Sequence, residues 1–193
     1  REGDLASQEA GKISKSKGSK PFSEMLAAFS GETIRFFLLS THYRRPIDFS
    51  DGRIREVETG LETFYRFFKR FERVTGESFY NLPAATLRKK GEFEPGDDPL
   101  LKNVAELRGR FLEAMDDDFN SGGGIGALFD LVRALNKYVD EQRLEEPSQQ
   151  AADKLAALRQ GATTLRELGL TLGIFRAPVD AAGSDKGGEL VGK

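Results

Sequence analysis

The chain has 193 residues and a formal net charge of −2, because 29 Lys and Arg residues stand against 31 Asp and Glu residues. This balance gives no global basic field, so anion binding must come from local patches, and DNA is not expected as a partner. The chain has no cysteine and one histidine, which excludes disulfides and thiolate metal ligands, and we expect no metal site. No apolar run approaches the about 20 residues that span a bilayer and no signal-peptide pattern opens the chain, so we expect a cytoplasmic protein without a membrane partner.

The first feature along the chain is a lysine-rich stretch at residues 11–20, GKISKSKGSK, with four lysines, three serines and two glycines. Lysine ammonium groups fit phosphate oxygens, and glycines let backbone amides approach a ligand, so such a loop can hold a phosphate. The Gly-Lys-Ser/Thr ending of a nucleotide-binding P-loop is missing, which excludes that motif. A solubilising arm has the same composition, and composition alone favours that arm.

Helical periodicity dominates from residue 22 onward. Two short helices are predicted, the second over residues 32–43, with Gly31 separating them and Pro46 ending the second. A long helix follows, whose apolar side chains recur at intervals of three and four residues and share one stripe: Ile54, Val57, Leu61, Phe64, Phe68 and Phe71. Residues 75–99 contain Gly, Pro and mixed charge, which predicts a long connection of the kind found in an insertion or an exposed loop.

Three more helices are predicted, over residues 100–115, 125–139 and 155–172, because each segment carries its own apolar stripe. No strand-like alternation of useful length occurs. The sequence therefore predicts an all-α fold in which four longer helices form an antiparallel bundle over residues 48–176, after a small helical part in residues 1–47. Both ends of the chain look like cuts through a longer polypeptide. We expect a fragment.

The order of residues in the lysine-rich stretch is informative. Lys12-Ile13-Ser14-Lys15-Ser16 resembles the KMSKS signature of class I aminoacyl-tRNA synthetases, with Ile13 in place of methionine. Glu32-Thr33-Ile34-Arg35 stands where those enzymes carry a D-x-L-R-like box. The following residues, FFLLSTHYRRPIDFS, and the later run MDDDFNSGGGIGALFDLVRALN are similar to cysteinyl-tRNA synthetases. The resemblance covers residues 11–175 and predicts a C-terminal part of such an enzyme, in which the KMSKS loop and short stem-contact helices precede a DALR-type bundle.

The resemblance implies a chemistry. Enzymes of this family join cysteine and ATP, used with magnesium, into cysteinyl-adenylate and then transfer the cysteinyl group to tRNA(Cys). Lys12 and Lys15 would be the catalytic residues, and Lys12, Ser14, Lys15 and Ser16 would bind ATP. Positioned positive charge is what phosphoryl chemistry requires. Lys17 stands where leucine is common in the family, and this departure puts the anchoring of the loop in doubt.

Other parts of the family pattern are missing from these residues. The catalytic nucleotide-binding domain with its HIGH-type sequence lies upstream of the signature, and the family's zinc ligands include cysteines, which this chain lacks. The zinc of the parent enzyme would therefore not be bound here, and the chain alone is expected to be inactive. We expect residues 177–193 to be a flexible tail towards a missing anticodon-binding domain. Two alternatives stay open. One is a fragment of the related ligase that joins cysteine to an amino-sugar inositol, and the other is a free-standing helical module that binds tRNA or phosphate without catalysis.

Four further polar features each have two interpretations. Residues 42–45, His-Tyr-Arg-Arg, either contact the inner corner of tRNA or complement a helix end. The basic edge formed by Lys69, Arg70 and Arg73 is interpreted as a solvated face rather than an RNA contact. Residues 116–118, three consecutive aspartates, are interpreted as helix-capping residues rather than a metal site. Residues 122–124, three glycines, are interpreted as a flexible start of a helix rather than a phosphate cradle.

Overall fold

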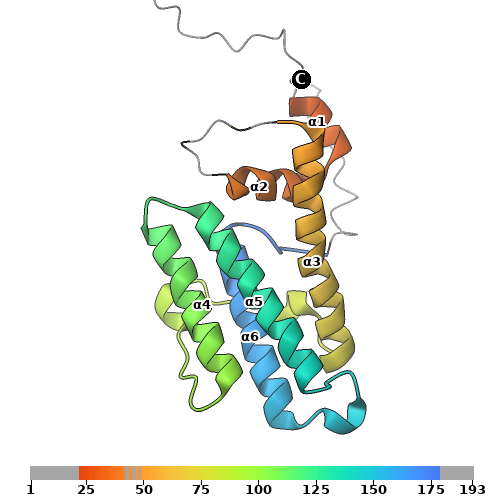
Figure 1. Cartoon of the computed structure of the whole chain (residues 1–193), viewed down its shortest axis with the longest axis vertical. Helices are drawn as coiled ribbons and strands as arrows, with labels where there is room; N and C mark the ends of the chain where they lie inside the picture. Colours follow the sequence, from red (N-terminus) through yellow and green to blue (C-terminus); the bar gives the residue numbers. More distant parts are fainter. Residues whose placement is uncertain (1–21, 42–43, 45–46, 48, 179–193) are drawn as a thin grey trace, which may run out of the picture.

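The computed structural model describes residues 22–41, 44, 47 and 49–178. The described residues form six α-helices and no strand, which confirms the predicted all-α class (Figure 1). The helices are α1 (Phe22–Ala28), α2 (Gly31–Ser40), α3 (Asp51–Thr75), α4 (Pro99–Asp116), α5 (Ser121–Glu141) and α6 (Ala152–Thr171), with short 3₁₀ turns at η1 (Phe79–Asn81), η2 (Arg88–Gly91) and η3 (Pro147–Gln149). Helices α3 and α5 run in one direction and α4 and α6 in the other, while α2 crosses the top of the bundle.

Side-chain caps set where several helices begin. Ser30 accepts a hydrogen bond from the backbone N–H of Thr33 at 3.0 Å, and Asp98 and Asn120 cap α4 and α5 in the same way. Because of the Ser30 cap, Gly31 is the first residue of α2 rather than the break that the sequence predicted. The same helix ends at Ser40 and not at residue 43, since Thr41 is already extended.

The main core is rich in phenylalanine. The predicted stripe of α3 is buried at Ile54, Leu61, Phe64, Phe68 and Phe71, while Val57 is half-buried. Phe67 and Val74 are buried as well, so the apolar face of α3 is wider than the predicted stripe. The reason is that α3 contacts neighbours on several sides, namely α2, α5 and η1. A smaller cluster joins α1 and α2 to the start of α3 through Met25, Phe29, Ile34, Phe37 and Ile54.

The long connection after α3 is fixed to the bundle by arginines. Arg166 of α6 donates to the backbone carbonyl of Leu82, and Arg159 of α6 pairs with Glu77 through two bonds of 2.7 and 3.0 Å. These bonds hold the pKa of the Glu77 carboxyl below its usual value. Farther along, Arg108 of α4 donates to the carbonyl of Arg88 at 2.6 Å. The connection is therefore anchored at three places, although parts of its surface are exposed.

The Arg108 guanidinium is itself held by a buried ion pair with Glu167 of α6. The two groups approach to 2.8 Å, and each side chain is 8% exposed. Charged groups this far from water are tolerated only when they are paired and hydrogen-bonded. Here the pair joins α4 to α6 and orients the bond to the carbonyl of Arg88. Within the described part of the chain, no helix is both long enough and apolar enough to cross a membrane.

Candidate functional site

The predicted ATP-binding residues, Lys12, Ser14, Lys15 and Ser16, lie outside the described residues, so their roles stay predictions. The structure describes the elements that follow these residues in sequence, namely α1, the Ser30 cap and α2, which contains the Glu32–Arg35 box. These elements position the first described residues after the lysine-rich stretch on the upper end of the bundle (Figure 1).

The Glu32–Arg35 box binds the segment that follows α6. A carboxylate oxygen of Glu32 accepts a hydrogen bond from the backbone N–H of Phe175 at 2.5 Å. Gly173 has a φ of +73°, and a Cβ placed there would lie 2.5 Å from a guanidinium nitrogen of Arg35. A side chain at residue 173 would be strained and would displace Arg35. Glu32 thus holds Phe175 against α2, and Gly173 leaves the space that the Arg35 side chain occupies.

Tyr65 of α3 adds a third partner to this contact. Burial raises the pKa of the Tyr65 phenol well above its usual value, and the carboxylate of Glu32 raises it further by its charge and by a hydrogen bond. The phenol therefore stays neutral and serves as a donor near Glu32. The box joins α2, α3 and the chain after α6, which gives it a structural role in this part of the molecule.

Replacing Glu32 with alanine is expected to lower the free energy of unfolding by about 1–3 kcal/mol, the usual cost of losing hydrogen bonds to a charged group. It should also lower the pKa of Tyr65, because the carboxylate is one of the causes that raise it. Urea unfolding and the pH dependence of tyrosinate absorbance measure the two effects, with Tyr65→Phe assigning the signal. The exposed Glu106→Ala in α4 is the matched control, and an unchanged Tyr65 titration in Glu32→Ala would contradict the contact.

The turn between α4 and α5 lies against the end of α2. Ser121 donates its hydroxyl to the carbonyl of Leu39 at 2.8 Å, and Arg44 pairs with Asp118 at 2.8 Å. Asp118 and Phe119 both have positive φ, 54° and 52°, and the Phe119 side chain is 72% exposed. Of the predicted tRNA-contacting residues 42–45, Arg44 alone is described. Its ion pair fits the structural interpretation, and contact with tRNA stays a prediction.

The three residues of the predicted basic edge on α3 have different surroundings. Arg70 pairs with Asp140 and Glu145, and Arg73 also pairs with Glu145. These arginines hold the pKa of Glu145 below its usual value. Neutralised charges attract a phosphate backbone weakly, so these pairs favour the solvated, structural interpretation of the edge. Lys69 differs, because it lines a pocket on the other side of α3.

The three aspartates at residues 116–118 end α4. Asp116 pairs with Arg88 at 2.7 Å, and Asp117 is the C-cap residue. In the part of the chain that the structure describes, no group of three His, Cys, Asp or Glu residues could hold a metal ion. The glycines at residues 122–124 form the first turn of α5, and a Cβ at Gly124 would lie 3.2 Å from the Phe111 ring. Gly124 therefore allows α4 and α5 to approach closely.

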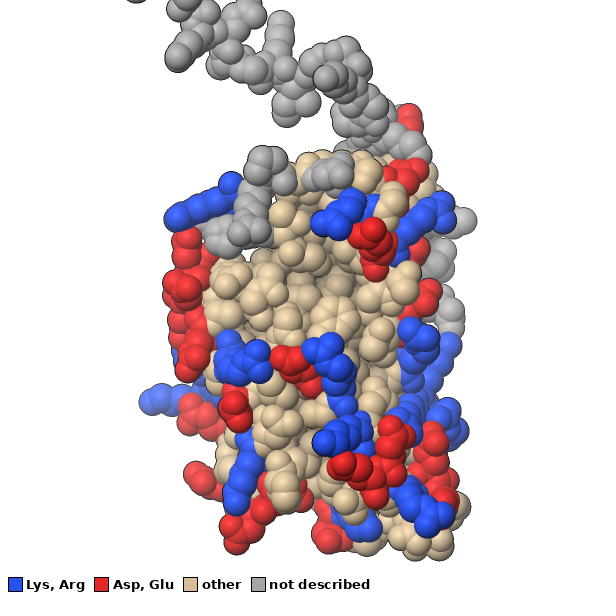
Figure 2. Space-filling view, in the orientation of Figure 1, with Lys and Arg blue, Asp and Glu red and all other residues tan. Residues whose placement is uncertain are grey.

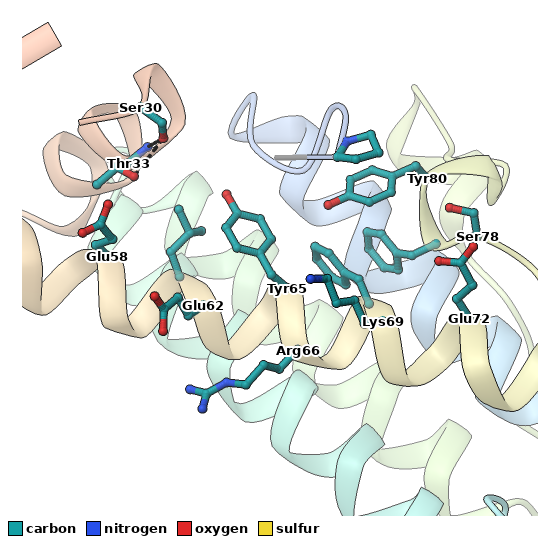
Figure 3. Close-up of a pocket in the computed structure, with 14 residues that line it drawn as sticks. Ser30, Thr33, Glu58, Glu62, Tyr65, Arg66, Lys69, Glu72, Ser78 and Tyr80 are labelled. Atoms are coloured by element: carbon teal, nitrogen blue, oxygen red, sulfur yellow. Dashed lines mark hydrogen bonds between the residues drawn. The ribbon is translucent and has the colours of Figure 1, made fainter. Parts of the chain in front are cut away.

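A pocket of about 640 Å³ opens along α3, between the start of α2, η1 and Pro178. Figure 3 shows Tyr65 and Tyr80 on its two sides, with Glu58 toward α2 and Glu72 toward Ser78. No pattern in the sequence predicted this site. The residues that line the pocket come from four separate segments of the chain, and no single segment carries a recognisable motif. The surface in Figure 2 carries acidic and basic side chains interspersed, without a broad basic field.

Residues 110–176, which include α5 and α6, match the family described as the DALR domain. The chain is also similar to cysteine–tRNA ligases. It is 38% identical over 165 residues to the enzyme of Geobacter metallireducens, and the matched part is 85% of this chain but 31% of that enzyme. It is 37% identical over 164 residues to the enzyme of Halalkalibacterium halodurans, covering 84% of this chain and 30% of that enzyme.

The predicted resemblance is therefore confirmed: the chain is homologous to cysteine–tRNA ligases over most of its length. A third relative, the cysteine–tRNA ligase of Pelobacter propionicus, is 37% identical over 166 residues, which are 85% of this chain and 32% of that enzyme. The chain thus spans about a third of the length of the curated relatives it matches.

Proposed function

We propose that this chain serves in a cysteine–tRNA ligase as the part that carries the KMSKS-like loop and the tRNA-contacting bundle. The observation that supports this proposal most is the 38% identity over 165 residues to a cysteine–tRNA ligase. The substrates of the complete enzyme would be cysteine, ATP and tRNA(Cys), and its place would be the cytoplasm.

Within the proposed enzyme, Lys15 and Lys12 supply positive charge to the phosphates of ATP, which is used with magnesium. Charge that is fixed in place before the reaction stabilises the phosphates as negative charge shifts toward the leaving pyrophosphate. Ser14 and Ser16 donate hydrogen bonds and shape the loop. The described helices do not perform this step. Helix α3 packs against α1 and α2, the helices that follow the loop in sequence, and so supports them.

The zinc of the parent enzymes does not fit the residues of this chain, which has no cysteine and a single histidine, His42. Selection of cysteine by zinc would therefore depend on other residues of the complete enzyme. The bundle contributes contacts to tRNA instead. The match of residues 110–176 to the DALR domain supports this assignment.

The 193-residue chain alone is expected to show no cysteine-dependent exchange between ATP and pyrophosphate, because it lacks the HIGH-type sequence and the cysteine-selecting ligands. The measurement is incorporation of labelled pyrophosphate into ATP, with a complete cysteine–tRNA ligase as the positive control. A robust cysteine-dependent signal from the chain alone would contradict the proposal. The free-standing module would be favoured by a different pair of results. The chain would bind tRNA, but a complete ligase that carries this chain would show no dependence of its catalysis on it.

A further inference from the structure

The pocket beside α3 is an elongated trough with carboxylates at both ends. Glu58 lies at the α2 end, and Glu72 lies at the η1 end beside Ser78 (Figure 3). The two residues are fourteen positions apart on one helix, which is about 21 Å at a rise of 1.5 Å per residue. Glu62 adds a third carboxylate along the same helix. The trough therefore suits a long, thin ligand rather than a compact one.

The middle of the trough is aromatic. Phe68 and Phe79 stack with their ring centroids 3.7 Å apart and an interplanar angle of 10°. Tyr80 stands edge-on to both rings, at 5.6 and 5.7 Å, and Tyr65 stands edge-on to Phe68 at 6.1 Å. The hydroxyl of Tyr80 points toward Tyr65, while the hydroxyl of Tyr65 points toward α2 (Figure 3). Phe68 and Phe79 are buried, so the rings open to a ligand are those of the half-buried Tyr65 and Tyr80. Such rings pack against methylene chains and attract cations.

The three carboxylates that line the trough outnumber its two cations, which favours a cationic ligand. No ion pair is formed by Glu58, Glu62 or Glu72 with another residue in the part of the chain that the structure describes. The raised pKa of Tyr65 has Glu32 and Glu58 among its causes, which is consistent with a negative field at this place. Two cations, Arg66 and Lys69, also line the pocket, and Lys69 lies between Tyr65 and Glu72 along the helix.

We propose that this trough binds a linear polyamine, with ammonium groups at the carboxylates of Glu58 and Glu72 and methylene segments over the aromatic residues between them. The Lys69 ammonium competes for the middle of the trough and must move aside when the ligand binds. None of the residues that line the trough belongs to the KMSKS-like signature, and the inference does not depend on the proposed function.

The test is calorimetric titration of spermine into the 193-residue chain at physiological salt. We expect saturable binding of one spermine, weakened about tenfold by Glu58→Gln or Glu72→Gln, since each removes one charge-assisted contact. Lys69→Met should tighten binding, because it removes the competing ammonium. Glu94→Gln removes the same charge from an exposed residue of the connection after α3 and is the matched control. Thermal unfolding of each variant checks that it is folded.

Three results would overturn the proposal. Binding that is weakened equally by Glu94→Gln would be a general attraction to an acidic protein. Spermine binding that is weakened by Lys69→Met would contradict the proposed placement, because removal of a competing ammonium should tighten the binding of a cation in the trough. Absence of spermine binding, together with binding of a peptide of sequence GKISKSKGSK that depends on Glu58, would assign the trough to the chain's own lysine-rich stretch.

Discussion

Replacing Lys15 with alanine in a ligase that carries this chain is expected to slow formation of cysteinyl-adenylate by about 10²- to 10³-fold, the usual cost of removing one positioned group that stabilises transition-state charge. A suitable ligase is the enzyme of Geobacter metallireducens in which the 165 matched residues are replaced by those of this chain. The effect should fall mainly on kcat, because the charge on the phosphates changes most in the transition state.

The matched control is Lys20→Ala, which removes the same charge from the same stretch but outside the five-residue signature. Pyrophosphate exchange should remain close to that of the unsubstituted chimera. Lys12→Ala should give a loss smaller than that of Lys15→Ala. Equal losses from Lys15→Ala and Lys20→Ala would show that the stretch acts only through its total charge, and the resemblance to the signature would then carry no catalytic meaning.

Replacing Glu167 with alanine is expected to lower the free energy of unfolding by about 3–5 kcal/mol, because it leaves a buried guanidinium without its partner. The Arg108 side chain is 8% exposed and depends on Glu167 for two of its hydrogen bonds. The same change should loosen the connection after α3, since Arg108 also holds the carbonyl of Arg88. Urea unfolding measures the first effect, and hydrogen exchange around η2 measures the second.

Two further variants test the cause of that loss. Glu146→Ala breaks an exposed pair with Arg143 and should cost at most about 1 kcal/mol. The double change Arg108→Met with Glu167→Leu removes both buried charges, so it should recover much of the stability that Glu167→Ala loses. If Glu167→Ala costs no more than Glu146→Ala, the buried pair does not have the structural role that its burial indicates.

Most of the fold could be predicted from local patterns, because each helix carries its own apolar stripe. The stripe of α3 from Ile54 to Phe71 is an example, and the buried residues follow it closely. The boundaries of α2 were less accurate. Gly31 and Pro46 are strong local signals, but the Ser30 hydroxyl caps the helix earlier and Thr41 ends it earlier. The domain boundary at residue 47 stays a prediction.

Contacts between distant segments could not be predicted in this way. The composition of residues 75–99 predicts an insertion or an exposed loop, yet Arg108, Arg159 and Arg166 fix this connection from helices that come later in the chain. Glu32 and Phe175 meet although 143 positions separate them. No periodicity links such residues. The trough beside α3 could not be predicted either, because its residues come from separate segments. The KMSKS-like signature was found because its residues are consecutive.

The most direct test of the account is aminoacylation of tRNA(Cys) with cysteine by the same chimera, in which this chain replaces the matched third of the Geobacter metallireducens enzyme. The account predicts that the chimera charges tRNA with cysteine and that Lys15→Ala removes most of this activity. A folded chimera that charges no tRNA, or one whose activity is unaffected by Lys15→Ala, would contradict the proposal that this chain supplies the loop and bundle of a cysteine–tRNA ligase.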